Sequence, residues 1–82
     1  MTDDKNEVYR KLLYFYKNEI AVHLKLFSGV WRNGIISSLN REEKMIILKE
    51  FVVGEIPLLF EEINPNTIAK FIKVGENGAT SN

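Results

Sequence analysis

The sequence predicts a mainly β domain in which one amino-terminal helix precedes five short strands that curve into a small barrel. The first observation is a change of hydrophobic period near residue 19, from the spacing of a helix to the two-residue alternation of a strand. The second is the placement of glycine and other turn residues between five short apolar runs. The third is Gly34 inside the second of these runs, where a missing side chain permits the sharp bend that a small barrel needs.

The helix is predicted over residues 4–17. Asp4, followed three residues later by Glu7, fits a capping box at its start. Apolar residues then recur at helical spacing and predict one face that docks on the rest of the domain; they are Val8, Leu12, Phe15 and Tyr16.

The five strands are predicted over residues 19–26, 30–39, 44–51, 55–60 and 67–74. The turns between them carry Ser28 and Gly29, a polar segment at 40–43, Gly54, and Asn64, Pro65 and Asn66. Alternation in the first strand predicts one buried face, whereas the continuous run 45–48 predicts a third strand buried on both faces. Residues 1–74 therefore form one domain, and 75–82 are expected to be a flexible tail.

Length and composition agree with a single folded domain. The chain has 82 residues, of which 45% are hydrophobic and 27% charged, an ordinary globular balance. A domain of this size buries only about 60–65% of the surface of its unfolded chain, so a partner surface would add to its stability. Because 11 basic and 11 acidic residues cancel, the strong positive charge typical of free-standing nucleic-acid-binding proteins is absent.

The inventory of reactive residues argues against an enzyme. There is no cysteine and His23 is the only histidine, which excludes a disulfide framework and a thiolate metal site. The pairs at 42–43 and 61–62 are glutamates, but neighbouring strand residues point to opposite faces and no third ligand accompanies them. We therefore predict no catalytic residues, no metal and no cofactor.

No apolar run approaches the roughly 20 residues that span a bilayer, and the acidic, polar amino terminus does not resemble a signal peptide. The sequence predicts an intracellular protein, nuclear or cytoplasmic, without a membrane partner.

In the order and spacing of these elements, residues 7–74 resemble the Sm and Sm-like (LSm) family. The stretch 27–40, FSGVWRNGIISSLN, places one glycine in the first hairpin and a second in a bent strand, as the first motif of the family does. The matching positions of that motif are Val22, Leu24, Leu26, Gly29, Gly34, Leu39, Asn40 and the run 46–48. The resemblance implies that the bent barrel is Sm-like.

The residues that hold RNA in the family are changed in this chain. Asn40 replaces the aspartate of the binding loop, and the loop at 41–45 is one residue longer and lacks the asparagine that contacts a base. Glu61 and Glu62 stand where the second motif has arginine and glycine, and carboxylates repel phosphate groups. The pattern is similar to divergent members that act as assembly partners, such as Gemin-type subunits.

In the family, the fourth strand of one subunit pairs with the fifth strand of the next. The resemblance therefore implies a non-catalytic Sm-like subunit that assembles edge to edge with other Sm-like proteins, or with itself, in an RNA-processing or RNP-assembly complex. The candidate interface residues are Ile56, Leu58, Phe60, Ile68 and Phe71. The alternative for each of them is that it fills the core of its own chain.

Two other functions stay open from the sequence. One is direct binding of single-stranded RNA by a homo-oligomeric ring, with Asn40, Arg41 and Lys44 as the contacts. The other is a small peptide-binding β-barrel unrelated to RNA. Trp31 and Arg32 could stack a base and hold a phosphate, but the favoured interpretation packs Trp31 on the helix and leaves Arg32 in water.

Overall fold

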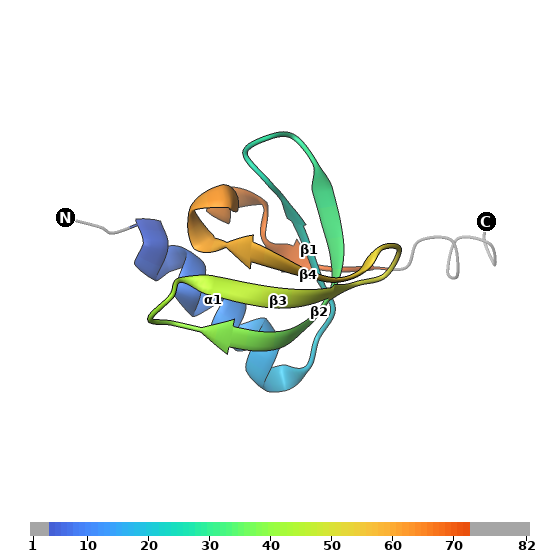
Figure 1. The fold of residues 1–82 in the computed structure, drawn as a ribbon, viewed down its shortest axis with the longest axis horizontal. Helices are drawn as coiled ribbons and strands as arrows, with labels where there is room; N and C mark the ends of the chain where they lie inside the picture. The colour runs from blue at the N-terminus through green and yellow to red at the C-terminus, as the bar shows by residue number, and fades with distance from the viewer. Residues whose placement is uncertain (1–3, 73–82) are drawn as a thin grey trace.

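The computed structural model describes residues 4–72, with side chains from residue 7 onward. The helix α1 (Asp4–Asn18) precedes the strands β1 (Val22–Lys25), β2 (Trp31–Asn40), β3 (Met45–Glu50), β4 (Gly54–Leu59) and β5 (Ala69–Lys70) (Figure 1). Two short 3-10 helices, η1 (Phe60–Glu62) and η2 (Pro65–Thr67), connect β4 to β5. The capping box at Asp4, the end of the predicted fifth strand and the tail at 75–82 lie outside the residues or side chains described. Among the described residues, no helix has the length and apolar character needed to cross a membrane.

The prediction of a mainly β fold behind one amino-terminal helix is confirmed. All strand pairs are antiparallel, and the strands lie in the order β4-β3-β2-β1-β5. The predicted barrel is not confirmed, because the sheet is not closed: β4 and β5 stand at its two edges. An isolated bridge between Leu26 and Ile63 draws the segment after β4 toward the end of β1.

Gly34 is the point at which β2 passes from one half of the sheet to the other. Residues before it pair with β1 and residues after it pair with β3, while Gly34 itself faces both Val22 and Glu50. A Cβ atom at this position would lie 2.2 Å from the carbonyl oxygen of Lys49. Only glycine permits this approach. The shift of register that a bulge produces does not lie at Gly34 but further along β2, between Ile36 and Ser38.

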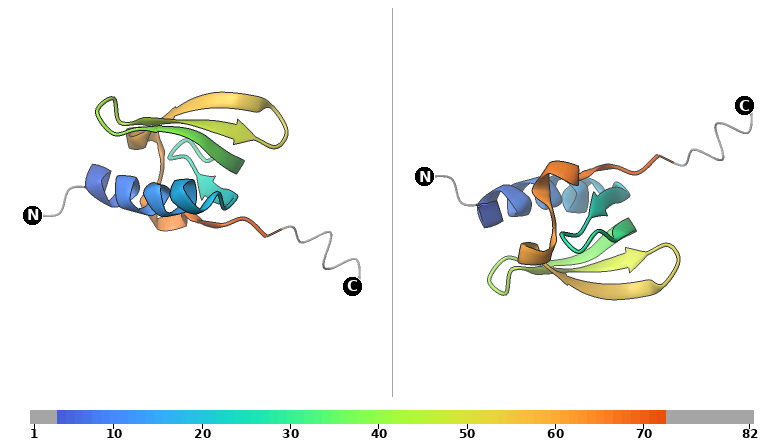
Figure 2. Two further views of the ribbon diagram at one scale, coloured as in Figure 1. Left: turned by 90° about the horizontal axis from the view of Figure 1, so that it is seen from below. Right: turned by 90° about the horizontal axis from the view of Figure 1, so that it is seen from above.

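The core lies between α1 and the concave side of the bent sheet. From the helix come Val8, Leu12 and Phe15, whereas Tyr16, predicted on the same face, is 38% exposed. The sheet and the turn after it contribute Val22, Leu24, Ile36, Ile46, Leu48, Leu58, Phe60 and Ile63. In the views from below and above, α1, β1, η2 and β5 lie together on one side of the molecule, and the β3–β4 hairpin lies on the opposite side (Figure 2).

The end of α1 explains why β1 starts three residues later than predicted. Glu19 adopts a left-handed backbone conformation with φ 54°, and Ile20 donates its N–H to the carbonyl of Phe15 at 3.0 Å. Together with the bond from Glu19 to Tyr16 at 3.3 Å, this forms a Schellman motif. The two residues that the alternation assigned to a strand therefore terminate the helix.

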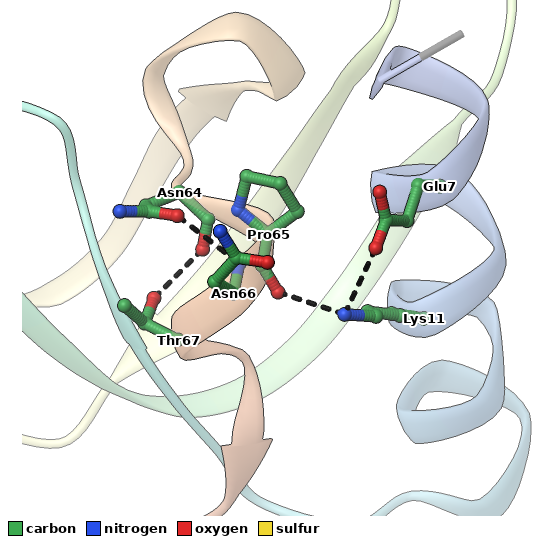
Figure 3. Close-up of polar contacts among 6 residues, drawn as sticks. All are labelled: Glu7, Lys11, Asn64, Pro65, Asn66 and Thr67. Carbon is green, nitrogen blue, oxygen red and sulfur yellow. Dashed lines mark hydrogen bonds and ion pairs between the residues drawn. The ribbon is translucent and has the colours of Figure 1, made fainter. Parts of the chain in front are cut away.

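A lysine fastens α1 to the segment that leads into β5. The Nζ atom of Lys11 lies 3.2 Å from the carboxylate of Glu7 and donates to the carbonyl of Pro65 at 3.0 Å (Figure 3). Within η2, the side chain of Asn64 accepts the N–H of Asn66, and the hydroxyl of Thr67 donates to the Asn64 carbonyl. The start of the β5 edge is thereby held against the helix.

Candidate functional site

The edge formed by β4 is the longer of the two unpaired edges. Phe60, one position beyond the register pair of Leu59 and Met45, donates its N–H to the carbonyl of Lys44 at 2.8 Å. Because hydrogen bonds alternate along an antiparallel pair, every second residue of β4 turns its backbone groups toward β3. The backbone groups of the other three residues point to the open edge; they are Glu55, Pro57 and Leu59.

This β4 edge is poor in hydrogen-bond donors. Pro57 has no N–H. The N–H of Leu59 is already donated to a carboxylate oxygen of Glu62, at 3.2 Å. As far as the described part of the chain shows, Glu55 is the one outward position that keeps a free N–H, while all three carbonyls remain acceptors. Proline and a side-chain cap are means by which natural sheets limit uncontrolled edge pairing.

The edge formed by β5 is short but open. Phe71, one position beyond the pair of Val22 and Lys70, donates its N–H to the carbonyl of Ala21 at 2.9 Å. The same alternation turns the N–H and carbonyl of Lys70 away from β1. Within residues 4–72, neither of these two groups of Lys70 has a hydrogen-bond partner.

The side chains predicted for the interface mostly pack inside the chain. Leu58 and Phe60 are 4% and 2% exposed and belong to the core, and Ile56 and Ile68 are half-buried against it. Phe71 is half-buried, with its ring 5.2 Å from that of Phe51. These five residues line the two edge strands and the turns next to them, but they offer an incoming strand little side-chain surface.

The residues that do face outward on β4 were missed by the sequence prediction. Leu59 is 40% exposed, and Glu55 and Pro57 are also exposed. The two-residue alternation could have predicted their exposure, because residues between the buried positions of a strand lie on its other face.

The three residues predicted to contact RNA lie together at the β2–β3 turn, where other groups of the protein engage them. The side-chain oxygen of Asn40 accepts the N–H of Glu43 at 2.9 Å. The guanidinium of Arg41 lies 5.1 Å from the centre of the Tyr9 ring on α1, a cation–π arrangement. Lys44 has φ 56° and uses its carbonyl to bind Phe60.

The charge around this turn is predominantly acidic. A shallow pocket beside Lys44 is lined by Glu43, Leu59 and Glu61. Glu42 and Glu62 are exposed on the same two segments. Four carboxylates thus accompany Arg41 and Lys44, which disfavours a phosphate backbone at this end of the sheet.

At the opposite end of the hairpin, a buried carboxylate organises an exposed apolar turn. Glu50 is 7% exposed and accepts the N–H groups of Val52 and Val53 at 2.8 and 2.9 Å, and that of Asn33 at 3.3 Å. These bonds, first that of Val53, lower the pKa of Glu50. The turn presents Phe51, Val52 and Val53, which are 53%, 87% and 56% exposed. We call these three residues the apolar turn.

Trp31 and Arg32 do not lie where the favoured interpretation placed them. The Trp31 ring is 45% exposed and stacks on His23, with 4.2 Å between ring centres, and Lys25 lies 5.7 Å from the Trp31 ring centre. His23 also hydrogen-bonds Asn33. Arg32 is opposite Leu24 in the register, and its Nε atom is buried without a hydrogen-bond partner. Trp31 therefore lies on the face away from the helix, and Arg32 lies toward the core.

No protein-family model and no curated protein matches this chain.

Proposed function

We propose that this protein is a non-catalytic Sm-like subunit that joins other Sm-like chains edge to edge in an RNA-processing or RNP-assembly complex. The observation that carries the proposal is the strand order, which leaves β4 and β5 as the two edges of one bent antiparallel sheet. Pairing between these edges is the mode of assembly that the resemblance implies. The bend at Gly34 and the glycine turns at Gly29 and Gly54, both with positive φ, also match the family pattern.

The chemistry of the β2–β3 turn supports an assembly role over direct RNA binding. Asn40 and Arg41 are engaged within the chain, and carboxylates surround Lys44. RNA in the complex would then be held mainly by other subunits. The isolated chain is expected to bind a labelled oligouridine weakly in fluorescence anisotropy, with no loss in a Lys44→Ala variant.

The test uses affinity purification of the tagged chain from its own cells, with identification of the co-purified proteins and RNA. The edge variant is Leu59→Lys, which places a charge on an exposed position of β4. The matched control is Ile35→Lys, because Ile35 is 37% exposed but lies on β2, inside the sheet. We expect partners with Sm-type sequences and RNA, which are lost with Leu59→Lys and retained with Ile35→Lys.

Two results would contradict the proposal. One is a set of partners without Sm-type sequences or RNA. The other is a complex that survives Leu59→Lys unchanged. Phe60→Asp is unsuited to this test, because Phe60 is a core residue and the substitution would unfold the chain.

A further inference from the structure

The charges of this chain are unevenly distributed along its sequence. No aspartate or glutamate occurs between Glu19 and Glu42, so the strands β1 and β2 contain no acidic residue. The basic residues of these two strands are Lys25 and Arg32, and His23 lies with them. A protein without net charge can therefore present a local positive potential over β1 and β2.

A pair of stacked rings lies on the outward face of these strands. Lys25 stands opposite Trp31 in the register, and His23 stands opposite Asn33. Because Val22 and Leu24 are buried, these four side chains lie on the other face of the hairpin, away from α1. The planes of the Trp31 and His23 rings are inclined by only 6°, and His23 hydrogen-bonds Asn33. The contacts hold the Trp31 ring in one orientation, although 45% of this residue is exposed.

The ammonium group of Lys25 supplies the positive charge beside the rings. It lies 5.7 Å from the centre of the Trp31 ring, and among the described side chains it forms no ion pair with a carboxylate. Arg32 lies toward the core and does not contribute to this face. Glu62 borders the β1–β2 turn beside Phe27, but a carboxylate oxygen of Glu62 accepts the N–H of Leu59.

We propose that the outward face of β1 and β2 binds single-stranded RNA, with a base stacked on Trp31 and the adjoining phosphate held by Lys25. Proteins that bind single strands combine exposed aromatic rings with nearby cations, because each base has a flat face and each linkage carries a negative charge. The exposed ring, the ammonium group and the absence of acidic residues from both strands favour this ligand over a peptide, whose backbone is uncharged. Phe27 and Val30 are also exposed and extend the surface to the turn.

This contact goes beyond the proposed function and is compatible with it. β1 and β2 are interior strands, so their outward face stays open when both edges of the sheet are paired. Their hairpin projects from the rest of the domain (Figure 1). The contact is also separate from the β2–β3 turn, where Asn40 and Arg41 are engaged within the chain. One stacked base and one phosphate give a low affinity, which agrees with the weak binding of oligouridine expected for the isolated chain.

The first test uses the fluorescence of the native, full-length chain. Trp31 is its only tryptophan, so the emission reports on this face alone. Unlabelled oligouridine is titrated into the protein, and stacking of a base on the indole ring is expected to quench the emission to a saturating value. Added salt should shift the midpoint to higher concentrations of oligouridine. Emission that stays unchanged while fluorescence anisotropy shows the oligonucleotide to be bound would place the RNA elsewhere on the chain and overturn the inference.

The second test compares variants by fluorescence anisotropy with labelled oligouridine, after circular dichroism has shown that each is folded. Trp31→Ala is expected to lower the affinity about tenfold, as for one stacked base, and Trp31→Phe to lower it less. Lys25→Ala should weaken binding and reduce the slope of log K against log salt concentration by about 0.7. The matched controls are Ile35→Ala and Lys49→Ala, which remove an exposed apolar and an exposed basic side chain from opposite positions of β2 and β3. Both controls are expected to bind as the unmodified chain does.

The outcomes separate this inference from the proposed function. A chain that binds no oligouridine, or whose binding survives both Trp31→Ala and Lys25→Ala, overturns the inference. The proposed function still stands in that case if Sm-type partners are lost with Leu59→Lys. Binding that depends on Trp31, together with partners that lack Sm-type sequences, supports the inference and contradicts the proposed function. Quenching of Trp31 by a proline-rich peptide but not by oligouridine would assign this face to a protein partner and overturn the inference.

Discussion

The two edges of the sheet differ in length and in how much of their backbone is free. β4 has six residues, but Pro57 and the bond from Leu59 to Glu62 leave it one outward N–H. β5 has two residues, and Lys70 keeps both of its outward groups. Strand length therefore does not measure how readily an edge accepts a partner strand. A long edge with one donor is selective, because only a strand in the right register can use that donor.

The greatest loss of stability is predicted at Gly34, where β2 passes from its pairing with β1 to its pairing with β3. Gly34→Ala forces a Cβ atom against the Lys49 carbonyl, so we expect the free energy of unfolding to fall by about 3 kcal/mol, the upper end of overpacking costs. Urea denaturation of the two proteins measures this difference in the free energy of unfolding. Gly29→Ala is the control, since its Cβ would meet no atom within 4 Å and only the strain of φ 100° remains. Equal losses in the two variants would show that the close approach at Gly34 does not hold the bend.

Proline substitutions distinguish the inner and outer backbone groups of β5. The alternation directs the N–H of Ala69 to His23 on β1 and that of Lys70 outward. Ala69→Pro should therefore cost about 2 kcal/mol more than Lys70→Pro in the free energy of unfolding. Thermal or urea denaturation of the monomer measures the difference. A larger loss in Lys70→Pro than in Ala69→Pro would mean that the N–H of Lys70, and not that of Ala69, bonds to β1.

The carboxylate under the apolar turn makes stability depend on pH. The pKa of Glu50 is lowered in the folded chain. The carboxylate therefore contributes fully to the free energy of unfolding above pH 4.5, the ordinary pKa, and this contribution is lost as the pH falls through the pKa of the folded chain. Glu50→Gln should cost about 1–2 kcal/mol at pH 7 and clearly less at pH 3. Urea denaturation at both pH values measures it, with the exposed Glu55→Gln as control. A pH-independent difference would contradict the role of the charge.

The smallest effect concerns the cap on the β4 edge. Glu62→Ala removes an exposed hydrogen bond and should change the free energy of unfolding by less than about 1 kcal/mol. Its effect should appear in amide hydrogen exchange by NMR, where Leu59 becomes as fast as Glu55 while Leu58 stays protected. A Leu59 amide that stays slow in the variant would mean that another group holds it.

Much of the fold followed from local sequence. The change of period after α1, the turns at Gly29 and Gly54 and the bend at Gly34 all predicted their elements, because each depends on the conformational freedom of a few neighbouring residues. The third strand was predicted to be buried on both faces, and this was wrong: Ile46 and Leu48 are buried, whereas Met45 and Ile47 are only half-buried and Lys49 is exposed. A continuous apolar run fixes a strand but not what covers its two faces.

The candidate site was less predictable. The sequence placed Asn40, Arg41 and Lys44 in one turn and assigned the interface to β4 and β5, but it chose the apolar side chains of β4, and two of these fill the core. A run such as 56–60 is apolar whether it meets its own chain or another. Local sequence patterns also did not predict two contacts, the hydrogen bond between Leu59 and Glu62 and the stacking of Trp31 on His23.

Local patterns of the sequence predicted the order of the elements, the positions of the glycine turns and the changed residues at the places where the Sm-like family holds RNA. The tertiary structure decided which backbone groups of β4 and β5 face outward, which residues of these strands are exposed, and where Arg32 and Trp31 lie. The physical reason is that local conformation depends on residues adjacent in the chain. The direction of a backbone hydrogen bond and the burial of a side chain depend instead on the strand that pairs beside it.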